Sequence, residues 1–139
     1  MKKFFLLSFL PTHVDFALLV LRLGLGLSMF LLHGWGKLTR ADSMFNTFAD
    51  PLGIGSRASY VLAAGGESVG ALMVALGLFA RFGAVWLGVV MGVAFFMAHG
   101  GKLMGQGNGE LPMIYLIGLV TLLIAGPGRF SFDAKMGGN

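Results

Sequence analysis

Four long apolar runs divide the chain, and glycine, proline or charged residues separate them. They cover residues 14–33, 58–79, 82–99 and 111–125. A helix needs about 20 mostly apolar residues to cross roughly 30 Å of hydrocarbon, so the fourth run is short for a full crossing. A lipid-exposed strand would leave its main-chain groups without hydrogen-bond partners. The pattern therefore predicts an all-α membrane protein, a four-transmembrane-helix antiparallel bundle that forms a single domain over residues 1–139.

The connections between these runs differ in kind. Only Ala80-Arg81 separates the second run from the third, which predicts a tight antiparallel hairpin. Residues 34–57 form the longest loop and contain a turn signal, Asp50-Pro51-Leu52-Gly53. A glycine-rich stretch precedes the fourth run, and a small polar tail, residues 127–139, follows Gly126. We expect an even number of spans, which places both ends of the chain on one side of the membrane.

The first 13 residues, MKKFFLLSFLPTH, begin basic and continue apolar. They lack the A-x-A cleavage site of a secretory signal, so we expect residues 1–13 to form an uncleaved interfacial segment. In that segment two lysines would lie among lipid headgroups and three phenylalanines at the acyl boundary: Lys2, Lys3, Phe4, Phe5 and Phe9. The terminal side of the bundle carries five lysines and arginines against four on the other side, which favours cytoplasmic termini.

Composition agrees with a membrane environment. Of the 139 residues, 56% are hydrophobic and only 12% are charged, about half the roughly 25% charged residues of soluble domains. The ten lysines and arginines are scattered and the net charge is +4, so no nucleic-acid partner is predicted. The chain has no cysteine, which excludes a disulfide framework, a thiol redox pair and a cysteine-ligated metal. The predicted partner is the lipid bilayer, together with other membrane subunits or a second copy of the chain.

Small residues recur every four positions on two of the predicted spans. Such residues let helix backbones approach closely, and this packing drives helix association within lipid. We expect a packing role for five of them in preference to a ligand cradle: Gly66, Gly70, Ala84, Gly88 and Gly92.

Two charged residues fall deep within the predicted spans. Arg22 and Glu67 are each about 12–14 Å from the start of their own span, counted from opposite faces of the bilayer. Both therefore lie near the midplane, where an isolated ion costs at least about 2.5–3.5 kcal/mol. We predict that the two side chains face the bundle interior and interact. The pair is either a structural ion pair or part of a polar pocket for a lipid headgroup, a proton or a quinone.

The stretch LLHGWGKLTR at the end of the first run adds polar side chains at one level of the bundle. His33 lies about three helical turns after Arg22 and so shares its face. His33 and His99 end spans on one side of the membrane, yet axial ligation of a b-type haem is less favoured than interfacial capping, and no metal site is predicted. No catalytic residue is assigned. The predicted polar pocket comprises Arg22, His33, Lys37, Glu67, His99, Glu110 and Tyr115.

Several motifs follow one another in a fixed order along the chain. They are Arg22-Leu-Gly-Leu-Gly, His33-Gly34-x-x-Lys37-Leu38, Glu67, Gly77-Leu-Phe-Ala-Arg81 and Gly126-Pro-Gly-Arg129-Phe-Ser-Phe-Asp133. Through these motifs and their order, the chain resembles the DoxX family of small bacterial membrane proteins, which includes DoxD-type subunits of thiosulfate:quinone oxidoreductase. The resemblance implies four membrane helices in the bacterial cytoplasmic (inner) membrane and a role as an oxidoreductase component or a partner in a membrane complex.

The sequence is therefore compatible with three functions. The first is an oxidoreductase-associated subunit with a quinone or proton site around Arg22, His33 and Glu67. The alternative is a purely structural or assembly subunit that docks other membrane proteins through its glycine-rich helix faces. A small carrier or channel ranks last, because the sequence shows no internal repeat of the transporter kind.

Overall fold

The computed structural model describes residues 5–7 and 11–137, and every regular element in these residues is helical. Three of its helices are long and apolar enough to span a membrane: Val14–Thr39, Ser56–Leu76 and Ala80–Ala98. The fourth apolar helix, Glu110–Ala125, has 16 residues and is therefore about 24 Å long. The all-helical membrane class is confirmed, whereas a fourth crossing stays a prediction. Among the predicted interfacial residues, Phe5 is exposed, and Lys2, Lys3, Phe4 and Phe9 lie outside the described residues.

Each of the three long helices contains one π turn. The first consists of α2 (Val14–Met29), η1 (Phe30–Gly34) and α3 (Trp35–Thr39), and a short α4 (Ala41–Met44) follows it. The second consists of α5 (Ser56–Gly65), η2 (Gly66–Gly70) and α6 (Ala71–Leu76), and the third of α7 (Ala80–Val93) and η3 (Ala94–Ala98). The chain ends with α8 (Glu110–Ala125) and α9 (Phe132–Lys135). Because the first helix continues to Thr39, it is six residues longer than the predicted run.

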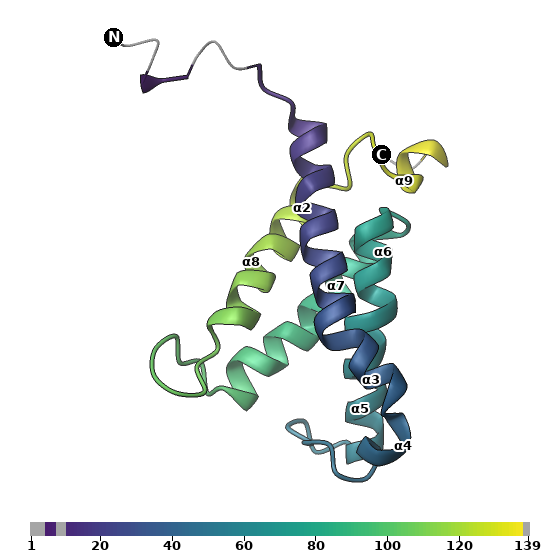
Figure 1. Ribbon diagram of the computed structural model, residues 1–139, viewed down its shortest axis with the longest axis vertical. Coiled ribbons are helices and arrows are strands. Elements are labelled where there is room, and N and C mark those ends of the chain that lie inside the picture. Colours follow the sequence, from purple (N-terminus) through teal and green to yellow (C-terminus); the bar gives the residue numbers. More distant parts are fainter. Residues whose placement is uncertain (1–4, 8–10, 138–139) are drawn as a thin grey trace.

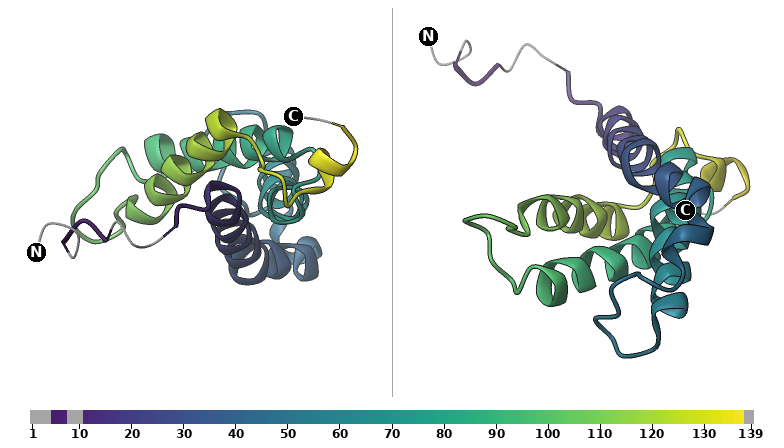
Figure 2. Two further views of the ribbon diagram at one scale, coloured as in Figure 1. Left: turned by 90° about the horizontal axis from the view of Figure 1, so that it is seen from above. Right: turned by 60° about the horizontal axis from the view of Figure 1, so that its bottom comes forward.

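The helices form two antiparallel pairs that share a core. Helix α2 packs on α6, α7 packs on α8, and α6 packs on α7. Leu87 and Leu119 are almost fully buried where the pairs meet. Away from this core, the α7–α8 hairpin diverges from α3 and α5, as Figures 1 and 2 show from three directions. The arrangement is thus more splayed than the compact antiparallel bundle that the sequence predicts.

Glycines on the first helix set its register against the second. A Cβ atom at Gly34 would lie 2.3 Å from the carbonyl oxygen of Glu67, and one at Gly26 would lie 2.6 Å from that of Ala71. Neither approach leaves room for any side chain. Both glycines belong to motifs quoted above, Arg22-Leu-Gly-Leu-Gly and His33-Gly34-x-x-Lys37-Leu38, but residues four positions away from them are large, so no packing role was predicted for them.

The predicted packing residues behave in two ways. A Cβ at Gly66 would meet the side chains of Val90 and Trp86, a Cβ at Gly70 would lie 3.5 Å from the carbonyl of Gly83, and Ala84 is buried. In contrast, a Cβ at Gly88 or Gly92 would meet no atom within 4 Å. These last two glycines face away from the neighbouring helices and do not pack the described chain.

The turn between the second and third helices falls three residues earlier than predicted. It consists of Gly77, Leu78 and Phe79, and both Gly77 (φ +69°) and Phe79 (φ +49°) are left-handed. Gly77 ends α6 in the manner of a C-terminal glycine cap, since the N–H of Leu78 reaches back to the carbonyl of Met73 at 3.0 Å. A left-handed phenylalanine is unfavourable by itself, so other contacts must hold this turn.

Residues 129–135, which we call the C-terminal clasp, supply those contacts. The two carboxylate oxygens of Asp133 accept hydrogen bonds from the N–H groups of Phe79 (2.7 Å) and Ala80 (2.9 Å) at the start of α7. The N–H of Asp133 donates to the carbonyl of Gly77 at 2.8 Å. Asp15 in α2 accepts from the N–H of Arg129 at 2.9 Å, which ties the clasp to the first helix.

Arg22 contacts this clasp and does not pair with Glu67. Its guanidinium donates to the carbonyl oxygens of Ala75 (3.2 Å) and Phe130 (2.8 Å), and the side chain is almost fully buried. The predicted Arg22–Glu67 interaction is therefore wrong. The first helix is displaced along the second, so Arg22 lies opposite Ala75, eight residues or about 12 Å beyond Glu67.

Removing the Asp133 carboxylate should destabilise the protein. We expect Asp133→Ala to lower the free energy of unfolding by about 1–2 kcal/mol, because two N–H groups at the start of α7 lose their cap. Thermal unfolding of the purified protein in one detergent would measure the change. Asp42→Ala, which alters an exposed carboxylate in the first turn of α4, should change stability by less than about 0.5 kcal/mol. Equal effects of the two substitutions would contradict the capping role.

Candidate functional site

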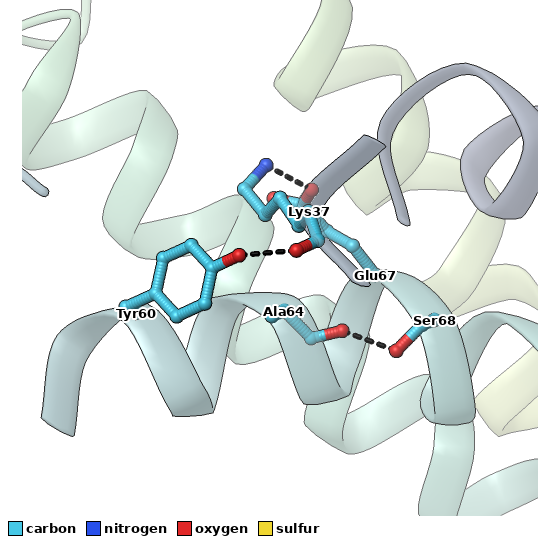
Figure 3. A network of polar contacts seen from close by, with 5 residues as sticks. All are labelled: Lys37, Tyr60, Ala64, Glu67 and Ser68. Atoms are coloured by element: carbon cyan, nitrogen blue, oxygen red, sulfur yellow. Dashed lines mark hydrogen bonds and ion pairs between the residues drawn. The ribbon is translucent and has the colours of Figure 1, made fainter. Parts of the chain in front are cut away.

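An ion pair links the first and second helices near the end of the first span. The ammonium group of Lys37 in α3 donates to Oε2 of Glu67 in η2, as Figure 3 shows. The side chains are 18% and 10% exposed, respectively. The Tyr60 hydroxyl donates to the main-chain carbonyl of Lys37, which fixes the backbone on which the lysine stands. The charge of Glu67, which the sequence analysis paired with Arg22, is thus balanced by Lys37.

The π turns bring Glu67 to this position. Turn η2 contains Glu67 and Ser68, and it packs against η1 of the first helix, where Gly34 meets the main chain of Glu67. The Ser68 hydroxyl donates to the carbonyl of Ala64 just before η2. Such π turns are rare and occur frequently at functional sites.

A pocket of about 180 Å³ lies beside this pair. The second helix, the third helix and the loop that precedes α5 form its walls. Most of its lining residues are apolar, and Glu67 is the one ionisable side chain among them. The lining comprises Phe48, Ala49, Pro51, Leu52, Ser59, Leu62, Ala63, Glu67, Trp86, Val89, Val90, Val93, Ala94 and Ala98.

Trp86 on the third helix closes one side of the pocket. Its indole N–H donates to the carbonyl of Leu62 at 3.2 Å. The ring fits against two glycines of the second helix, because a Cβ at Gly65 would lie 2.4 Å and one at Gly66 3.2 Å from ring atoms. The absence of side chains at these glycines therefore allows the ring to form a flat wall between the helices.

The loop wall is anchored by Asp50. Its carboxylate accepts hydrogen bonds from the Ser59 hydroxyl (2.7 Å) and from the N–H groups of Ile54 (3.0 Å) and Gly55 (2.7 Å). The Ser59 hydroxyl, followed by the backbone donors, holds the pKa of Asp50 below its usual value. The rings of Phe45 and Phe48 pack edge-on against Tyr60, with centroid distances of 5.1 and 5.3 Å. The loop, the second helix and the ion pair are therefore connected.

Two sequence comparisons identify proteins that are similar to this chain. A sequence model of the DoxX family matches residues 17–100. The chain belongs to the DoxX family. It is also similar to an uncharacterized protein of Haemophilus influenzae, with 31% identity over 120 residues that cover 77% of this chain and 81% of the relative. No solved structure gives a significant match. The matched region of this DoxX protein contains Lys37, Glu67 and every residue that lines the pocket.

The remaining residues of the predicted polar pocket are dispersed in this DoxX protein. His33 is half-buried on η1 and makes no side-chain hydrogen bond within the described residues. The Nδ1 atom of His99 lies 2.8 Å from the carbonyl of Gly107, so this histidine fastens the glycine-rich loop. His33 thus lies on the first helix, and His99 directly follows η3 of the third helix.

The two predicted residues on α8 also lie apart from the pocket. Glu110 is exposed in the first turn of α8. Tyr115 is buried, and its hydroxyl shares a 2.7 Å hydrogen bond with the hydroxyl of Ser28 on α2. Neither residue lines the pocket, and neither do Arg22 and His33. Of the predicted set, the structure therefore brings Lys37 and Glu67 together and leaves the other five elsewhere.

Sequence reasoning missed three features of this site. Trp86 and Tyr60 were not singled out, although an aromatic ring with a polar atom requires a hydrogen-bond partner when it is buried. The anchoring role of Asp50 was also missed, but its position directly before Pro51 in a turn was a usable signal, because aspartate side chains often bind main-chain N–H groups in turns.

Proposed function

We propose that this DoxX protein is an integral subunit of an oxidoreductase or electron-transfer complex in the bacterial cytoplasmic membrane, and that its pocket takes up the ring of a quinone. The observation that supports this proposal is a mostly apolar pocket with a single ionisable side chain, Glu67, at the level of the membrane spans. Apolar pockets with a few convergent polar groups are typical of small-molecule sites. An ionisable residue inside a membrane span is a functional candidate by default.

The size of the pocket agrees with a ring-shaped ligand. Its volume is about 180 Å³, close to that of an engineered cavity of about 150 Å³ that binds benzene in another protein. There is room for one six-membered ring, and the isoprenoid tail of a quinone would remain in the bilayer. Glu67 would then be the group that exchanges a proton with the ring oxygen.

The proposal includes the topology of the chain. Helix α8 would form a fourth crossing, with local thinning of the bilayer to match its length of about 24 Å. Four crossings and the small excess of lysines and arginines on the terminal side would place both termini in the cytoplasm.

A fluorescence experiment tests the quinone site. The chain has two tryptophans, so in a Trp35→Phe background Trp86 is the one indole and reports on the pocket wall. We expect decylubiquinone to quench Trp86 in a saturable manner in lipid nanodiscs. Ala63→Phe, which fills the pocket, should remove the saturable part. Ala58→Phe, at an exposed position of the same helix α5, should leave it intact. Quenching that rises linearly with decylubiquinone concentration in every variant would refute the site.

The second candidate is a structural or assembly subunit. It is favoured by Gly88 and Gly92, which offer a smooth face of the third helix that no part of the described chain covers. Another membrane subunit, or a second copy of the chain, would pack there. Two results together would favour this function over the first. Quenching by decylubiquinone would be linear, and partner subunits would co-purify stably with the wild type but not with Gly88→Leu.

A further inference from the structure

The polar side chains that line the pocket differ in their remaining hydrogen-bond capacity. Three lining residues carry polar side-chain atoms: Ser59, Glu67 and Trp86. The other eleven lining side chains are alanine, valine, leucine, proline or phenylalanine and offer neither donor nor acceptor. The ligands that the pocket can bind therefore depend on which donors and acceptors of these three side chains have no partner within the described residues.

The donors among them are already in use. The indole N–H of Trp86 donates to the carbonyl of Leu62 at 3.2 Å. The hydroxyl of Ser59 donates to the carboxylate of Asp50 at 2.7 Å. An indole and a hydroxyl each have one donor hydrogen, so neither residue has a second one for a ligand.

An acceptor remains at Glu67. Its Oε2 atom accepts from Lys37, and no hydrogen bond among the described residues reaches Oε1. A carboxylate oxygen is a strong acceptor, and hydrogen bonds to charged groups are stronger than those between neutral groups. The Ser59 hydroxyl keeps acceptor lone pairs as well, but it is neutral. The side chains of the pocket thus present free acceptors, of which the Glu67 carboxylate is the charged one, and no free donor.

We infer that the pocket selects aromatic rings that carry a hydroxyl donor, so that it binds a quinol more tightly than the corresponding quinone. This inference rests on the proposed function, since it names the redox state of the same ligand. A quinone has only carbonyl acceptors, which find no side-chain donor in the pocket. A quinol, or a simple phenol, donates to Oε1 of Glu67.

The ion pair also determines the charge of the ligand. Because Lys37 already balances Glu67, a neutral ligand leaves the site neutral. A lipophilic ammonium ion would add an unbalanced positive charge to an apolar environment, which is strongly unfavourable. The inferred ligand class is therefore neutral hydroxylated rings. Rings that carry a charged alkylammonium group are excluded.

Ring-matched probes test the inference without redox chemistry. We would compare 2,6-dimethylphenol, 2,6-dimethylanisole and 2,6-dimethylbenzylamine at neutral pH, each by its ability to displace decylubiquinone and so relieve the saturable quenching of Trp86 in the Trp35→Phe background. Affinities would be corrected for partition into the nanodisc lipid. We expect the phenol to bind at least about tenfold more tightly than the anisole, the factor that a charge-assisted hydrogen bond confers. The benzylamine should bind more weakly than the phenol.

Two variants separate the acceptors. Glu67→Gln should bring the phenol-to-anisole ratio close to one, because an amide can both donate and accept. Ser59→Ala should leave the ratio unchanged. Equal binding of phenol and anisole by the wild type would overturn the inference while leaving the quinone site intact. Tighter binding of the benzylamine would also overturn it, whereas failure of decylubiquinone and all three probes to bind would reject the proposed function itself.

Discussion

Lys37→Met is expected to destabilise the protein more than Glu67→Leu, and the double substitution is expected to be milder than Lys37→Met alone. Removing one partner of a buried ion pair costs about 3–5 kcal/mol, because the other charge is left uncompensated. In Lys37→Met the remaining carboxylate lies at the wall of an apolar pocket and is 10% exposed. In Glu67→Leu the remaining lysine is 18% exposed and has a long stem that can reach toward the interface.

The double variant Lys37→Met/Glu67→Leu removes both charges. Replacement of a whole buried pair by apolar side chains is often close to neutral, so most of the stability lost in Lys37→Met should return. Thermal unfolding of the four proteins in one detergent would give the coupling free energy. Arg40→Met, which removes a neighbouring exposed cation, serves as the control and should have little effect. A double variant as unstable as Lys37→Met would show that the pair does not act as a unit.

The second large effect is expected at Gly34. A Cβ atom there would lie 2.3 Å from the carbonyl oxygen of Glu67 and 3.0 Å from the Cα of Ser68. Both atoms belong to the main chain of η2 and cannot move aside by a change of rotamer. Gly34→Ala should therefore push the first helix away from the second, at or above the upper end of the roughly 1–3 kcal/mol that overpacking typically costs.

A matched substitution lies two residues away. A Cβ at Gly36 in α3 would meet nothing within 4 Å, so Gly36→Ala should be neutral or stabilising by up to about 1 kcal/mol, since alanine favours the helix. Gly34→Ala should also weaken saturable quenching of Trp86 by decylubiquinone, because displacement of η2 moves Glu67 at the pocket. If both alanine variants unfold at the same temperature, the close approach of η1 and η2 is not what holds these helices together.

The location of Glu67 shows how far sequence reasoning extends. The apolar surroundings of Arg22 and Glu67 correctly predicted that both side chains would be buried, since each is at most 7% exposed as a residue. The choice of partner depended on how far the first helix slides along the second. A shift of about two turns moved Arg22 from Glu67 to Ala75, and the sequence contains no measure of that shift.

The C-terminal clasp gives a second example. The motif Gly126-Pro-Gly-Arg129-Phe-Ser-Phe-Asp133 was recognised as part of the family resemblance, and its glycines and proline correctly predicted the end of the last apolar helix. Its contacts with Phe79 and Ala80 join positions 53 or more residues apart. Spacing along the chain does not predict such contacts, because they arise only when the helix pairs pack.

The sequence by itself determined that this protein is helical and belongs in a membrane. In hydrocarbon a helix satisfies its main-chain hydrogen bonds within one segment, so a long apolar run is sufficient to specify it. Only the tertiary structure decided that Lys37 balances Glu67, that Arg22 serves the clasp, and that a pocket opens beside the pair. Those outcomes depend on helix register, on the π turns and on close glycine contacts such as the one at Gly34. A change of one or two residues in the register of two helices brings a different side chain opposite each position.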